Sequence, residues 1–97
     1  MADKLSPATK ELYQAILRLK NLNEAKAFLR DLLTLQEIET FAKRFQQAKL
    51  LHQGYSYSQV AKKLKVSTTT VTRTAFWLKR GRGGYRLILN RLLPKKK

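Results

Sequence analysis

The chain has no cysteine, only one histidine, and no acidic residue after Glu39. Without cysteine there is no disulfide, thiolate zinc site or cysteine nucleophile, and the lone His52 leaves no histidine pair for a metal. No apolar run approaches the roughly 18–20 residues that span a bilayer, so we expect no membrane-spanning segment. The first residues lack the apolar core of a signal peptide, which favours a cytoplasmic protein. General acid–base catalysis would need a carboxylate or a second group near His52, so we expect no enzyme.

Positive charge is abundant and is confined to one part of the chain. The 97 residues include 21 Lys+Arg and 6 Asp+Glu, a formal net charge of +15. All six acids and six of the bases lie in residues 1–39, whereas the remaining 58 residues carry 15 bases. Segregated positive charge favours a face that binds a polyanion, and we expect double-stranded DNA of the nucleoid. An anionic membrane surface or a merely solubilising surface is the alternative.

Helix caps and apolar spacing predict an all-α protein of about six helices in a single domain, residues 1–97. Ser6-Pro7 opens the first helix, Asn23 caps the second, and the capping box Thr34–Glu37 opens the third, which stops at Gly54. The capping box Ser56–Gln59 opens the fourth helix, and Ser67 caps the fifth. Residues 85–93 form the sixth helix, which ends before Pro94. We assign residues 1–55 mainly to core and dimerisation, 56–80 to a helix-turn-helix, 84–93 to the C-terminal helix and 94–97 to a basic tail.

The apolar faces of the predicted helices are too wide for a small monomer. The first helix carries two apolar stripes, one with Leu12, Ile16 and Leu19 and one with Tyr13 and Leu17. Six short helices offer few places to bury so much surface within one chain. A homodimer is therefore favoured over a single crowded core.

Residues 56–78 have the spacing of a helix-turn-helix. The small Ala61 allows the second helix to cross closely over the first, and Val66 and Val71 fill the wedge between them. Lys65 occupies the turn position where this motif often needs a left-handed backbone, which glycine adopts most easily. The alternative is an ordinary helical hairpin.

The second helix of this motif presents side chains suited to base edges near its N-terminus. Lysines and arginines around it suit phosphates, which set register but not sequence. The expected base contacts are Thr68, Thr69, Thr70, Thr72 and Arg73, and the expected phosphate contacts are Lys62, Lys63, Lys65, Lys79, Arg80 and Arg82.

Four segments together resemble the Trp-repressor superfamily, and within it the branch of YerC/YecD-type Trp-repressor-like proteins. They are Leu32–Arg44, Gly54–Ala61, Ser67–Arg73 and Gly84–Leu89, within residues 25–93. The resemblance implies an intertwined all-helical dimer whose two recognition helices enter successive major grooves. The operator would then be roughly palindromic, with half-sites about one helical turn apart.

The resemblance also implies a candidate effector pocket. Arg44 and Arg73 match the two arginines that hold the indole of free tryptophan in the Trp repressor. Two departures weaken this match, because Thr74 replaces a glycine and Trp77 replaces a small residue. Trp77 lies one helical turn after Arg73, where a guanidinium can stack on its indole. One hypothesis is therefore that Trp77 fills the pocket and that the protein binds DNA without a cofactor.

Three alternatives remain open for these residues. A small-molecule corepressor such as tryptophan would restore the family's ligand. Arg44 and Arg73 would otherwise be phosphate contacts or ion partners at the dimer interface, and Trp77 would be a core or interface aromatic. The leading prediction for the chain is a sequence-specific transcriptional regulator, acting as a dimeric repressor. The competing prediction is a basic protein of the nucleoid, or an RNA-binding protein, without sequence preference.

Overall fold

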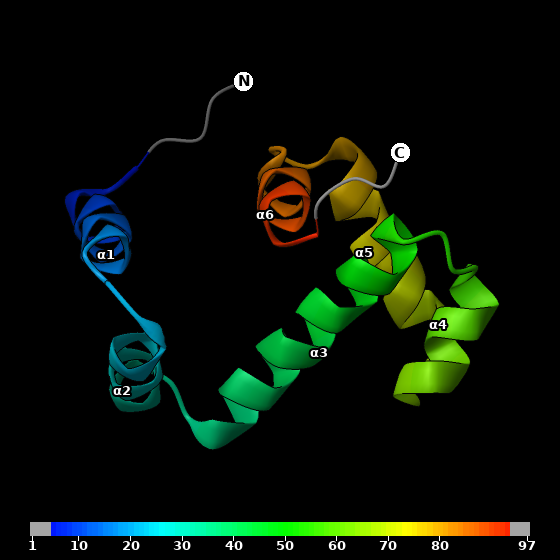
Figure 1. Cartoon of the computed structure of the whole chain (residues 1–97), viewed down its shortest axis with the longest axis horizontal. Coiled ribbons are helices and arrows are strands. Elements are labelled where there is room, and N and C mark those ends of the chain that lie inside the picture. Colours follow the sequence, from blue (N-terminus) through cyan, green and yellow to red (C-terminus); the bar gives the residue numbers. More distant parts are fainter. Residues whose placement is uncertain (1–4, 94–97) are drawn as a thin grey trace. The chain divides into compact units, whose positions relative to one another are not determined.

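The computed structural model describes residues 5–93 and confirms the all-α fold class (Figure 1). No strand occurs among these residues, and none of their helices combines the length and apolar character required to cross a bilayer. The helices are α1 (Pro7–Leu17), α2 (Leu22–Leu32), α3 (Leu35–His52), α4 (Tyr57–Leu64), α5 (Thr68–Arg80) and α6 (Gly84–Leu92). The predicted sixth helix thus begins and ends one residue earlier than residues 85–93, and the predicted basic tail, 94–97, lies outside the described residues.

Most helix starts follow the predicted caps. The Ser6 hydroxyl accepts the backbone N–H of Thr9 at 3.1 Å, with proline in the first turn. Thr34 and Glu37 form the expected reciprocal box, because the N–H of Thr34 donates to the Glu37 carboxylate (2.9 Å) and the N–H of Glu37 donates to the Thr34 hydroxyl (3.0 Å). Such exchanges satisfy backbone donors that a helix terminus leaves free.

The predicted cap of α2 was wrong. Asn21, not Asn23, is extended and accepts the N–H of Glu24 through its side-chain oxygen at 2.9 Å. The Glu24 carboxylate in turn accepts the N–H of Lys20 at 2.9 Å. An N-cap acts on the residue three positions later, so Asn21 is spaced to use Glu24, whereas Asn23 already lies inside the helix.

The chain divides into two compact units, Met1–Ile38 and Glu39–Lys97. In the first unit, α1 and α2 bury no residue at all. Large apolar side chains are instead exposed, among them Leu17 (80%) and Leu22 (81%). The described part of this unit therefore has helices but no core of its own.

The second unit has a packed core beneath its helix-turn-helix. Val60 and Val71 are fully buried with Ala61 between them, and Val66 of the turn packs against this cluster, as predicted. α3 contributes to the same core and ends where Gly54, at φ 101°, reverses the chain in a conformation that L side chains rarely adopt. The cluster is completed by Leu50, Leu51 and Leu64.

Candidate nucleic-acid interface

α4, α5 and the short turn between them form the candidate interface. Lys65 ends α4 in the left-handed conformation, at φ 58° and ψ 47°, and is the only described non-glycine residue with positive φ. The N–H of Val66 donates to the Ala61 carbonyl at 3.0 Å, and Ser67 then caps α5 by accepting the N–H of Thr70 at 3.1 Å. The predicted left-handed turn is therefore present, with a lysine where glycine would be unstrained.

The five predicted base-contacting residues are all exposed, and they share the N-terminal half of α5. Their hydroxyls differ in what they can still bind. Thr70 shares a hydrogen bond with Ser67 (2.9 Å), and Thr72 donates to the carbonyl oxygen of Thr68 (2.9 Å). Within the described chain, the hydroxyls of Thr68 and Thr69 have no partner. These two retain a donor and acceptors for a base edge, while Thr72 offers mainly an acceptor and its methyl group.

The six predicted phosphate-binding side chains are exposed as well, and two of them lie over tyrosine rings. The Lys63 ammonium is 5.6 Å from the centre of the Tyr55 ring, and the Lys79 ammonium is 5.6 Å from that of Tyr57. Lys79 also donates a hydrogen bond to the Tyr57 hydroxyl at 3.3 Å. An ammonium held over a ring is attracted by its electron-rich face, so the tyrosines orient two of the candidate phosphate contacts.

Sequence reasoning missed Tyr55 and Tyr57. Both lie at the start of α4, on either side of the capping residue Ser56, and an aromatic pair next to basic helices was the available signal. The link from Tyr57 to Lys79 spans 22 residues, so no local spacing could predict it.

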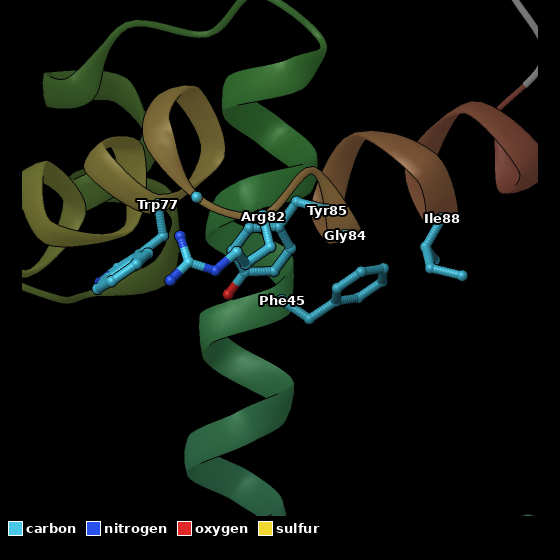
Figure 2. A pocket seen from close by; sticks show the side chains of 7 residues that line it. Phe45, Trp77, Arg82, Gly84, Tyr85 and Ile88 are labelled. Carbon is cyan, nitrogen blue, oxygen red and sulfur yellow. The ribbon is translucent and has the colours of Figure 1, made fainter. Parts of the chain in front are cut away.

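A separate open hollow of about 480 Å³ lies in the same unit (Figure 2). Trp77 of α5, Phe45 of α3, and Tyr85 and Ile88 of α6 line it together with Gly81, Arg82 and Gly84. The ring centres of Phe45 and Tyr85 are 6.4 Å apart. The walls are therefore mostly aromatic and aliphatic.

Only Trp77 of the three predicted effector-pocket residues lines this hollow. Its indole, 52% exposed, meets Phe76 edge-on at 5.2 Å between ring centres. The Arg44 guanidinium lies over Phe41 at 5.4 Å instead, and the described chain shows no stacking of Arg44 or Arg73 on Trp77. The expected arginine–indole contact is thus not observed.

Burial beside the hollow favours the neutral form of the Tyr85 phenol. Burial raises the pKa of Tyr85 above its ordinary value, and the positive charge of Arg44 opposes this increase in part. A neutral phenol can donate a hydrogen bond but is a poor base at neutral pH. Among the described residues, no group of three or more His, Cys, Asp or Glu side chains could hold a metal ion.

Gly81 closes α5 by a close approach of the backbone. Its N–H donates to the Trp77 carbonyl oxygen at 2.9 Å, and a Cβ at this position would collide with that same oxygen. The side chain of Trp77 is also near the missing Cβ, at 3.3 Å. Glycine is therefore favoured at the end of α5.

Comparison with known proteins gives one consistent result. The family model described as Trp repressor protein matches residues 8–93. YerC of Bacillus subtilis (strain 168), an uncharacterized protein, is 34% identical over 82 residues, which cover 84% of this chain and 79% of YerC.

Two solved structures share the fold. A TrpR-like protein from Eubacterium eligens superimposes with a TM-score of 0.86 at 38% identity, covering 95% of each chain. A candidate Trp repressor from Staphylococcus aureus gives a TM-score of 0.86 at 35% identity, covering 96% of this chain and 93% of its own.

Proposed function

The chain belongs to the Trp repressor protein family, and on this premise we propose that it is a sequence-specific DNA-binding regulator that represses transcription as a homodimer. In this proposal α5 is the recognition helix and enters the major groove of an operator in the nucleoid, within the cytoplasm. The observation that carries it is the exposed N-terminal half of α5, where two threonines keep free hydroxyls beside Arg73.

The charge around α5 supports DNA as the partner. The candidate phosphate contacts lie on α4, the turn, and the C-terminal end of α5 and its following loop, and no acid occurs after Glu39. Cations on both sides of a recognition helix anchor the two phosphate strands that border a groove. Thr68, Thr69, Thr72 and Arg73 then discriminate base pairs, and the surrounding lysines and arginines supply most of the affinity.

The exposed apolar faces of α1 and α2 support the homodimer. Ile16, Leu17 and Leu22 lie uncovered on helices that bury nothing. Apolar surface of this kind is covered in most soluble proteins, and a second copy of the chain offers the same surface in return. Residues 1–55 then serve mainly association, and residues 56–80 bind DNA.

No small-molecule corepressor is part of the proposal. By the resemblance, Thr74 replaces a glycine and Trp77 replaces a small residue of the Trp repressor, and neither Arg44 nor Arg73 lines the hollow. DNA binding is therefore expected without added tryptophan, and a titration that shows tryptophan tightening it would contradict this part.

Selection of bound duplexes from a random pool, repeated at two salt concentrations, tests the function. We expect one roughly palindromic site, bound about 10³-fold or more tightly than random duplex. The logarithm of affinity should fall with the logarithm of salt at a slope of about −7 to −11, because a dimer here would neutralise about 8–12 phosphates. A protein without sequence preference would show the salt slope but a ratio near one.

A further inference from the structure

A buried polar contact joins the recognition helix to α3. The Thr74 hydroxyl donates to the Gln47 side-chain oxygen at 2.7 Å, across 27 residues of sequence. Both residues are nearly inaccessible, at 5% and 3% exposure. Among the described residues, this is the only hydrogen bond between two side chains that is buried.

Thr74 has a local alternative that it does not use. A helical threonine can donate to the carbonyl four residues earlier in its own helix, and Thr72 does so to Thr68. Thr74 donates across to α3 instead. Its bond therefore contributes to the placement of α5 and nothing to the internal hydrogen bonding of that helix.

The surroundings of this bond are apolar. Val71 and Ala75 lie on the same stripe of α5 and are buried, as is Ala48 beside Gln47 on α3. Apolar contacts are non-directional and tolerate a small rotation or slide of one helix on another. A hydrogen bond weakens steeply with angle and distance, and an unpaired buried oxygen is costly, so this contact opposes such movements of α5 on α3.

The same arrangement sets where the base-reading side chains point. Val71, Thr74 and Ala75 form the buried stripe at helical spacing, and Thr72 and Arg73 lie between them in sequence, off that stripe. A rotation of α5 about its axis would move both exposed residues relative to a base pair. A shift by one residue would advance them by about 1.5 Å and turn them by about 100°.

We infer that Thr74 and Gln47 are positioning residues, whose buried hydrogen bond fixes the rotation of α5 on α3 and thereby the sequence discrimination of the protein. This inference rests on the proposed function of α5 as a recognition helix. It assigns to the pair a role in specificity that is distinct from its contribution to stability.

Removing both partners separates these two roles. Thr74→Val alone leaves the Gln47 oxygen buried and unpaired, so the melting temperature of this single variant should be lower than that of the wild type. The double variant Thr74→Val/Gln47→Met replaces both polar groups with apolar ones of similar shape, a change that can be nearly neutral for stability. We expect the double variant to melt within a few degrees of the wild type.

The deciding measurement is affinity for the duplex selected by the wild type and for a random duplex of equal length. The double variant should lose at least about tenfold in the ratio of the two, while its affinity for random duplex stays within about twofold, since phosphate contacts remain. The matched control, Thr40→Val/Gln46→Met, makes the same chemical change at exposed positions of α3 and should preserve the ratio.

Thr74→Ser keeps the inference testable if the double variant does not fold. It retains the hydroxyl and loses the methyl group, so it should keep the wild-type ratio even if it is less stable. Unchanged discrimination in a folded double variant, or lost discrimination in Thr74→Ser, would overturn the inference. A wild type that shows no preference for any duplex would instead contradict the proposed function.

Discussion

The two compact units of the chain differ in both burial and charge. In Met1–Ile38, α1 and α2 expose large apolar side chains and bury none, and acids balance bases over residues 1–39. Glu39–Lys97 encloses a valine-rich core and carries 15 Lys/Arg against a single acid, Glu39. One unit has apolar surface without a core, and the other has a core beneath a positively charged surface.

Under the proposed function, this difference assigns association and DNA binding to different parts of the sequence. Nearly neutral apolar helices can meet a second copy without the repulsion that the excess of positive charge in the basic unit would impose there. In this proposal the basic unit holds α5 on its own core, and its exposed cations can contact phosphates. Variants in the basic unit should therefore change DNA binding and spare association, whereas variants on α1 or α2 should change association directly and operator affinity only through it.

The largest expected effect comes from charge placed on the apolar face of α1. Ile16→Glu/Leu17→Glu should prevent dimerisation, because two carboxylates would be buried without partners in the interface. A monomer loses the benefit of two linked half-sites, which amounts to about 10²–10⁴-fold in affinity for a palindromic operator. Sedimentation equilibrium and operator titration measure the two effects.

Gln14→Glu is the control for that variant, because it adds negative charge to an exposed polar position of the same helix. It should remain dimeric and bind the operator with little loss. A dimeric Ile16→Glu/Leu17→Glu protein would show that α1 is not at the interface and would remove the contrast between the units.

The local features of both units could be predicted from the sequence. The boxes Thr34–Glu37 and Ser56–Gln59 and the cap Ser67 depend on partners three residues away, so their pattern is visible in the sequence itself. The exposure of the threonines of α5 is likewise predictable from their spacing along the helix relative to its apolar residues. Asn21 and Asn23 are both candidate caps, but only Asn21 lies three residues before an acid, Glu24, whose backbone N–H it accepts.

Contacts between distant segments were not predictable. The bond from Thr74 to Gln47 and the bond from Lys79 to Tyr57 depend on how helices cross, which local spacing does not specify. For the same reason the resemblance grouped Trp77 with two arginines, while its ring contacts Phe76. The division of the chain near residue 38 coincides with the change in charge after Glu39, but charge alone does not show which segments pack together.

The second prediction sharpens the description of the basic unit as tightly packed. Gly81→Ala should destabilise it by about 1–3 kcal/mol, because the new Cβ would overlap the Trp77 carbonyl oxygen and α5 would have to shift. Gly84→Ala is the control, since a Cβ there meets nothing within 4 Å and alanine favours a helix. Thermal unfolding measures both, and equal melting temperatures would mean that the end of α5 yields without cost.

A third prediction separates reading from anchoring within the basic unit. Thr69→Ala removes a free hydroxyl and should change the preferred base at one operator position, by about 1–3 kcal/mol. Lys63→Ala should weaken binding to all sequences about equally and reduce the salt slope by about one. Affinities for a set of single-base operator variants measure the difference, and a uniform loss in both proteins would mean that α5 does not read sequence.

The strained turn gives a smaller effect with opposite signs for two properties. Lys65→Gly should stabilise the fold by up to about 1 kcal/mol, because glycine adopts the left-handed backbone without a Cβ penalty. It should also weaken DNA binding through the loss of a phosphate contact. Lys65→Ala is the matched control, since it loses the same contact but retains a Cβ. If both variants have the same melting temperature, backbone strain at Lys65 is negligible.

The smallest expected effect concerns the tyrosine beneath Lys79. Tyr57→Phe keeps the ring under the ammonium but removes the hydroxyl that accepts the 3.3 Å hydrogen bond. Lys79 would remain near the groove with more rotational freedom, so affinity for both selected and random duplex should fall by only about 0.5 kcal/mol, the lower range for a hydrogen bond of this kind. Tyr57→Leu removes the cation–π attraction as well and should cost about 0.5–1 kcal/mol more, as for exposed cation–π pairs. Neither change should alter the preferred bases, since Lys79 contacts charge and does not read sequence.

Competition titrations against the two duplexes resolve such differences, and the variant Tyr13→Phe, on α1 of the N-terminal unit, provides the control. A change of base preference in Tyr57→Phe would place this tyrosine among the residues that read the operator, and the basic unit would then contain a second reading element besides α5.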